Sequence, residues 1–168
     1  MVSKLRRGLR EGLILLVLLV VVSVLVDAWR APQLPSSFDS TPLQTVDGET
    51  VTLAKLSAEK PVLLYFWASW CSICRFTTPD VARLQREGGN VMTIALRSGS
   101  EADVSRWLAR KNVTFPVIND ASGEISRRWE ISVTPTLVIV SKGEVVSTTS
   151  GWTSYWGMRL RLWWANTF

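Results

Sequence analysis

The chain has 168 residues, of which 47% are apolar, and this length suits one compact domain with an appendage. Its net charge is +5, but four of its 19 basic residues precede residue 12, so the remainder is nearly balanced and indicates no nucleic-acid partner. Two cysteines and no histidine exclude histidine catalysis and histidine-ligated zinc, and two cysteines are few for a disulfide-stapled scaffold.

An apolar run occupies residues 13–26 and is broken only by Ser23. A helix of that length spans roughly 21 Å, against about 30 Å for the bilayer core, so the run is short for a spanning helix but long for a signal-peptide core. Arg10 can snorkel at one end and Trp29 can lie in the opposite interface, which extends the usable length. We therefore favour an uncleaved anchor over a cleaved signal peptide.

This pattern divides the chain into four parts. The basic cluster before the run should stay in the cytoplasm, so the rest of the chain should lie outside a bacterial inner membrane, in the oxidising periplasm. We expect a single-pass protein with a cytoplasmic basic segment over residues 1–12, a transmembrane anchor over 13–29, a linker over 30–37 and a folded domain over 38–168.

The periodicity of the folded domain predicts alternating strands and helices. Residues 61–67 form a continuous apolar run, which is typical of a strand that is buried on both faces of a sheet. The element order gives an α/β domain with a mixed sheet and helices on both faces. We expect strands at residues 38–43, 51–53, 61–67, 91–96, 115–118, 136–140 and 145–149, and helices at 71–87, 100–110, 123–129 and 154–165.

The two cysteines are placed where this buried strand meets the next helix. Cys71 falls at the expected helix start, where free N–H groups and the helix dipole favour a thiolate, which is the nucleophilic form. Cys74 lies one turn further on the same face and can close a disulfide. A structural disulfide and a two-thiolate Cu(I) site are the alternatives, whereas a zinc site needs four ligands. The placement favours a redox pair.

A second feature is the segment 133–136, which enters an expected strand. From the residues alone, Pro135 indicates a fixed turn, a cis bond or simply the start of the strand.

Taken together, these segments resemble the thioredoxin superfamily. Residues 66–74 are similar to its active-site segment, residues 134–136 to its cis-proline loop and residues 151–154 to the entry to its last helix. The resemblance covers about residues 38–168. The strand and helix between residues 96 and 131, the anchor and residues 95–99 resemble the membrane-anchored periplasmic branch that includes the suppressor-of-copper-sensitivity proteins.

The resemblance implies a thioredoxin fold with an inserted strand-helix segment and an N-terminal transmembrane helix. It implies catalysis by Cys71 and Cys74 as a redox-active disulfide, with no other cofactor and no metal, and substrate binding by Trp70, Thr134 and Pro135. The partners would be protein thiols and disulfides and a membrane electron-donor protein. The function would be that of a reductant or isomerase linked to copper tolerance.

Several residues depart from the family pattern. An uncharged Ser72-Ile73 dipeptide separates the cysteines, so a strongly oxidising couple is not expected. Tyr65 occupies the place of a buried aspartate that serves as a proton acceptor in cytosolic thioredoxins, and a phenol is a poor acceptor. The carboxylates proposed in its place, by location alone, are those of Asp120, Glu124 and Glu130.

Other interpretations remain. A Cu(I)-binding module is the alternative function, although the chain lacks histidine and has only three methionines. A thiol peroxidase is disfavoured by the tryptophan-rich approach to Cys71. Arg97 follows a strand at the edge expected for Cys71, where we favour a solvated side chain over a thiolate partner. In the last helix, we expect packing rather than membrane contact for Trp156, Leu160, Trp163 and Trp164.

Overall fold

The computed structural model describes residues 2–29 and 40–167, which fall into two compact units, Met1–Ala31 and Pro32–Phe168. The first unit holds one helix, α1 (Val2–Trp29). None of the helices in the described ranges combines the length and sustained apolarity that crossing a bilayer requires. The anchor over residues 13–29 therefore stays a prediction, and the linker over residues 30–37 lies outside the described residues.

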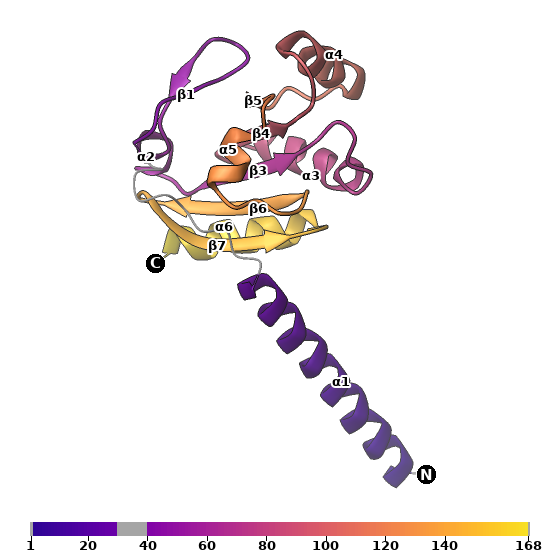
Figure 1. Cartoon of the computed structure of the whole chain (residues 1–168). Helices are drawn as coiled ribbons and strands as arrows, with labels where there is room; N and C mark the ends of the chain where they lie inside the picture. The colour runs from indigo at the N-terminus through magenta and orange to yellow at the C-terminus, as the bar shows by residue number, and fades with distance from the viewer. Residues whose placement is uncertain (1, 30–39, 168) are drawn as a thin grey trace. The chain divides into compact units, whose positions relative to one another are not determined.

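The second unit is built on a five-stranded mixed sheet with the order β5-β4-β3-β6-β7 (Figure 1). Strands β3, β4 and β5 run parallel, while β6 pairs antiparallel with both β3 and β7. The strands are β3 (Val62–Trp67), β4 (Val91–Leu96), β5 (Val117–Asp120), β6 (Thr136–Ser141) and β7 (Glu144–Ser150), and a separate pair comprises β1 (Leu43–Gln44) and β2 (Thr50–Val51). The helices are α2 (Leu53–Ser57), α3 (Cys74–Arg86), α4 (Glu101–Lys111), α5 (Glu124–Arg128) and α6 (Tyr155–Thr167).

Every residue of β3 is buried, as its apolar run predicts, because both faces of the sheet are covered. On one face, Leu63, Tyr65 and Trp67 join a core with side chains of α3, α4 and α6. On the other face, alternate residues of β3 pack against the shorter helices α2 and α5. The predicted α/β architecture, with a mixed sheet and helices on both faces, is confirmed.

Several element predictions differ from the structure in their bounds. Within the described residues, the strand expected over residues 38–43 is β1, which begins only at Leu43. The strand expected over residues 51–53 ends at Val51, because the Thr52 side chain accepts a hydrogen bond from the Lys55 N–H and starts α2 there. The helix expected from Cys71 begins only at Cys74, with Ile73 as its N-cap.

Candidate active site

Cys71 and Cys74 form a disulfide at the junction between β3 and α3, with their Cα atoms 5.4 Å apart. Cys71 lies in the loop and is half-buried, whereas Cys74 is the first residue of α3 and is only 1% exposed. The Cys74 backbone N–H donates a hydrogen bond to Cys71 Sγ at 3.1 Å. Although Cys71 precedes the helix, its sulfur therefore still receives a free N–H group of the helix start, and this contact favours negative charge on it.

The neighbouring strand β4 supports the loop that carries Cys71. The hydroxyl oxygen of Ser98, just beyond the end of β4, accepts a hydrogen bond from the Ser69 N–H at 2.9 Å. Trp70 is 63% exposed, and its indole N–H donates to the Arg97 carbonyl at 3.1 Å. Ser98 was not predicted as a site residue, although parallel strands that end at the same edge of a sheet could have indicated it.

A second loop covers Cys71 from the start of β6. The Thr134–Pro135 peptide bond is cis, and the Thr134 carbonyl oxygen lies 3.5 Å from Cys71 Sγ. The Pro135 carbonyl accepts a hydrogen bond from the Gly151 N–H at 2.8 Å, so this loop is tied to the end of β7. The structure thus brings Thr134 and Pro135 beside Cys71.

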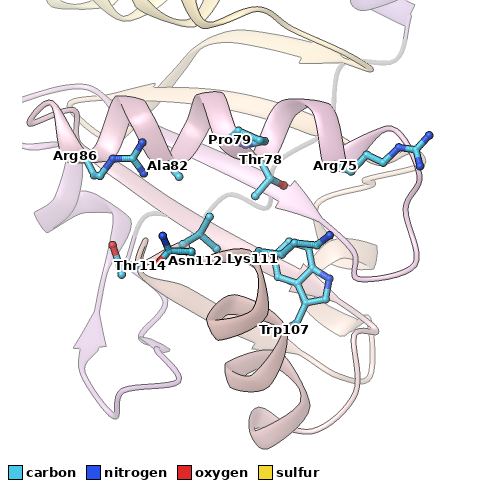
Figure 2. Close-up of a pocket in the computed structure, with 10 residues that line it drawn as sticks. Arg75, Thr78, Pro79, Ala82, Arg86, Trp107, Lys111, Asn112 and Thr114 are labelled. Carbon is cyan, nitrogen blue, oxygen red and sulfur yellow. The ribbon is translucent and has the colours of Figure 1, made fainter.

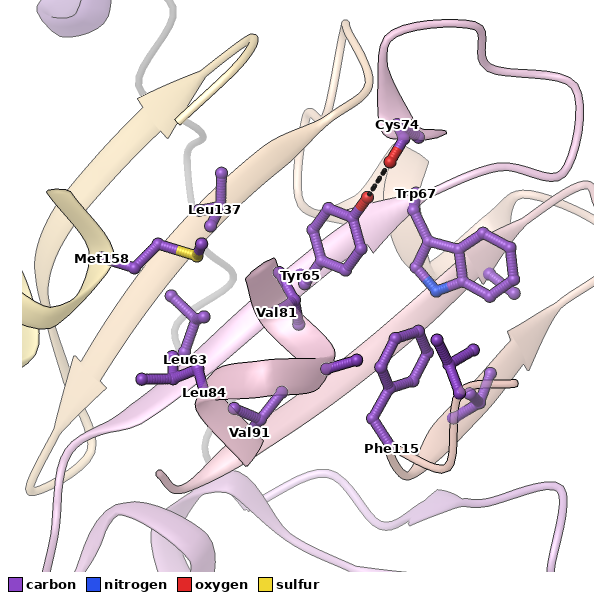
Figure 3. Close-up of a cluster of buried hydrophobic side chains, with 14 of the residues drawn as sticks. Leu63, Tyr65, Trp67, Cys74, Val81, Leu84, Val91, Phe115, Leu137 and Met158 are labelled. Carbon is purple, nitrogen blue, oxygen red and sulfur yellow. Dashed lines mark hydrogen bonds between the residues drawn. The ribbon is translucent and has the colours of Figure 1, made fainter. Parts of the chain in front are cut away.

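Tyr65 lies beneath the buried cysteine (Figure 3). Its hydroxyl donates to the Cys74 carbonyl at 3.3 Å and shares a hydrogen bond with the Thr78 hydroxyl at 3.0 Å. Burial raises the pKa of Tyr65 far above its ordinary value, so the phenol stays protonated at physiological pH. Tyr65 therefore positions the backbone of Cys74 and does not act as its proton acceptor.

The carboxylates suggested as substitutes for that acceptor do not bond to either sulfur. Asp120 is buried at the end of β5, two strands from β3, and its oxygens accept the N–H groups of Ile125 and Ser126 at the start of α5. Glu124 pairs with Arg128. Glu130 is exposed after α5. Asp120 is thus a helix cap, and the proposal of a replacement proton acceptor in this region lacks structural support.

Arg97 also points away from the disulfide. Its guanidinium donates to the Ser122 carbonyl at 3.3 Å, in the loop before α5. Within residues 2–29 and 40–167, the hydrogen bonds of the Cys71 sulfur are to backbone groups, and no charged side chain bonds to either sulfur.

A groove of about 430 Å³ opens between α3 and α4 (Figure 2). It is lined by Arg75, Arg86 and Lys111, with Trp107 between the helices, but by neither cysteine. It is therefore separate from the redox pair. No group of three or more metal-ligating side chains occurs in residues 2–29 or 40–167.

The chain is similar to several known proteins in sequence and in structure. The chain matches the AhpC/TSA family over residues 35–148. It is 42% identical to a thioredoxin-like protein of Haemophilus influenzae over 98% of this chain and 99% of that protein. It is 31% identical to the thiol-disulfide oxidoreductase ResA of Oceanobacillus iheyensis, over 64% of this chain and 58% of that protein. The crystal structure of an exposed lipoprotein thioredoxin from Streptococcus pneumoniae superposes with a TM-score of 0.62 at 32% identity, over 73% of this chain and 96% of that one.

Proposed function

Since the chain belongs to the AhpC/TSA family of the thioredoxin superfamily and is a protein-disulfide oxidoreductase, we propose that it is a membrane-tethered, periplasmic reductant or isomerase of protein disulfides. The thioredoxin fold predicted from the sequence is confirmed. The observation that supports the exchange chemistry is the unequal burial of the two cysteines: Cys71 is half-buried and Cys74 is buried.

This asymmetry assigns the steps of the exchange. In the reduced protein, the Cys71 thiolate attacks one sulfur of a substrate disulfide, that S–S bond breaks, and the departing substrate sulfur takes up a proton. Cys74, after losing its proton, attacks Cys71 in the mixed disulfide and releases the second substrate thiol. Two electrons pass to the substrate, and the Cys71–Cys74 disulfide forms again.

The membrane tether rests on α1. The side chains of residues 13–22 in this helix are apolar and exposed. The one hydroxyl in the apolar run, that of Ser23, donates to the Leu19 carbonyl at 2.8 Å, which satisfies it inside the helix as a lipid surrounding requires. The basic residues before the run favour a cytoplasmic N-terminus and a periplasmic redox domain.

A reporter fusion tests this topology. An enzyme that is active only in the periplasm should be active when it is fused after Phe168, because the basic cluster should keep the N-terminus inside. Activity of a cytoplasm-only reporter at the same position would overturn both the tether and the compartment.

The links to copper tolerance and to a membrane electron donor rest on the resemblance to the suppressor-of-copper-sensitivity proteins, and a Cu(I)-binding module is the second candidate function. Cys71 and Cys74 would be the two thiolate ligands, and thiolates are the soft ligands that Cu(I) prefers. Insulin reduction and Cu(I) titration of the reduced chain separate the two candidates. Disulfide exchange predicts insulin reduction without copper, whereas a copper module predicts tight Cu(I) binding and no reductase activity.

A further inference from the structure

One face of α6 exposes four large apolar side chains, which we call the α6 aromatic face. These residues were expected to pack in the core and on the surface of the last helix. The Trp156 ring does contact the Tyr155 ring, but all four side chains are more than half exposed. The exposed fractions are 70% for Trp156, 63% for Leu160, 61% for Trp163 and 59% for Trp164. Their spacing of four, three and one residues places them on one side of the helix. An exposed apolar group of this size on a folded domain marks an interaction surface.

The helix that carries this face is firmly attached to the domain. Tyr155, Met158 and Ala165 on its other side are buried in the core against the sheet and α3. The Tyr155 hydroxyl donates to Glu87 at the end of α3, and the Asp80 carboxylate accepts the Tyr155 N–H at 3.1 Å. The aromatic face is therefore the solvent-facing side of a helix whose other side is packed in the core.

The charges of α6 are all positive. Between Tyr155 and Thr167 the helix has two arginines and no acidic residue. At 100° per residue, Arg159 lies beside Trp163 at one border of the aromatic face, and Arg161 lies beyond Trp164 at the other. Arg159 also reaches Glu87 at 3.5 Å, whereas the Arg161 guanidinium donates to a carbonyl of its own helix.

We propose that the α6 aromatic face lies in the headgroup region of an anionic membrane. Tryptophan prefers this region because its ring is apolar while its N–H can bond to headgroups and water. Arginines that flank an apolar stripe on a helix can contact lipid phosphates, which is the pattern of a helix that lies in a membrane interface. Tryptophan is also enriched at protein interfaces, so the flanking arginines favour lipid, and a second protein surface is the alternative that the experiment distinguishes.

This contact would hold the domain that carries the Cys71–Cys74 pair near the membrane. Helix α6 starts at Tyr155, four residues after Gly151, and the Gly151 N–H is bonded to the Pro135 carbonyl beside the disulfide. A domain held at the membrane in this way would be close to the thiols of membrane proteins. This consequence rests on the proposed function, whereas the lipid contact itself does not.

Fluorescence quenching by lipid tests the contact. The full chain is bound to vesicles of phosphatidylglycerol and phosphatidylethanolamine whose acyl chains carry bromine, a contact quencher of tryptophan. The chain is compared with a triple variant that carries Trp156→Gln, Trp163→Gln and Trp164→Gln. If the face lies in lipid, the substitutions remove quenched emitters and the quenched fraction of the emission falls. If it lies in water, they remove unquenched emitters and the quenched fraction rises, which would overturn the proposal.

Controls separate this contact from other causes. Helix α1 and Trp29 are the same in both proteins, so binding of α1 to the vesicles does not decide whether the quenched fraction rises or falls. Insulin reduction in solution should be equal in both proteins. Leu160→Gln removes no emitter and should still lower the quenched fraction. Replacing phosphatidylglycerol with phosphatidylcholine should lower it in the unmodified chain. A dimer in lipid-free solution that the triple variant abolishes, with a rising quenched fraction, would assign the face to a second copy and overturn the lipid contact.

Discussion

The sulfur of Cys71 lies 3.5 Å from the carbonyl oxygen of Thr134. In the reduced protein, a Cys71 thiol can donate to this oxygen, and that bond favours the protonated form. The Cys74 N–H on the other side of the sulfur favours the thiolate. Two backbone contacts with opposite effects on a thiolate therefore meet at the Cys71 sulfur.

This balance predicts the redox potential. A thiolate with little stabilisation gives a comparatively stable disulfide, so we expect a potential nearer that of thioredoxin, at about −270 mV, than that of a strong oxidant, at about −120 mV. Equilibration with a glutathione buffer measures it. A value above roughly −150 mV would reverse the assignment as a reductant or isomerase.

A substitution between the cysteines tests whether the lack of charge at this position keeps the redox potential low. Ile73 is 46% exposed, so Ile73→His adds an imidazole without disturbing the core. A cation beside the sulfur should lower the Cys71 pKa and shift the potential upward. An unchanged potential would show that charge beside Cys71 does not control the redox potential of the cysteine pair.

The loop that carries Thr134 leads to a prediction for its neighbour. Pro135 fixes the backbone that holds the Thr134 carbonyl against Cys71. We expect Pro135→Thr to loosen this cover, to slow release of the substrate and to let mixed disulfides accumulate, with a smaller effect on thermal stability. Non-reducing gels and insulin turnover measure these effects. Normal turnover with no adducts would contradict a role for this loop in exchange.

Tyr65 predicts a dependence of stability on pH. Its pKa is raised by burial, so the folded chain keeps the phenolic proton at a pH where the unfolded chain, with an ordinary value of about 10, loses it. This contribution to stability is present below pH 10 and is lost as the pH rises above it. Above about pH 10, the free energy of unfolding measured in urea should therefore fall more steeply with pH for the unmodified chain than for Tyr65→Phe.

At neutral pH the same variant should be less stable. It loses the hydrogen bonds of the hydroxyl to the Cys74 carbonyl and to Thr78, which should cost about 1–3 kcal/mol because both partners are buried. Its insulin reduction should have the same pH profile as the unmodified chain, since the phenol does not exchange protons during turnover. A changed profile would show that Tyr65 takes part in proton transfer.

Much of the fold follows from local patterns in the sequence. The buried strand β3, the strands β6 and β7 and the helix α4 were all predicted, because each depends on residues near one another in the chain. In the structure, Ser100 and Asp103 form a capping box at the start of α4, with Asp103 in place of the usual glutamate or glutamine.

The features that the sequence did not predict depend mostly on contacts between segments that are distant in the chain. The start of α3 was placed at Cys71, but the helix begins at Cys74, and Ile73 at the N-cap position makes no side-chain capping bond that the sequence could have indicated. The support of Ser69 by Ser98 joins residues 29 positions apart. The exposure of Trp163 on α6 could not be predicted, because helical spacing gives the members of a face but not which face meets the core.

The two cysteines should have different roles in the exchange. Cys71 is half-buried, and its sulfur accepts the Cys74 N–H, so it should have the lower pKa and attack the substrate. Cys74 is 1% exposed and should resolve the mixed disulfide from within. We therefore expect Cys74→Ser to trap covalent adducts that a reductant cleaves, and Cys71→Ser to trap none, as mass spectrometry of non-reduced samples would show. A copper module would lose metal in both variants alike and trap no protein, and adducts on Cys71→Ser alone would exchange the roles of the two residues.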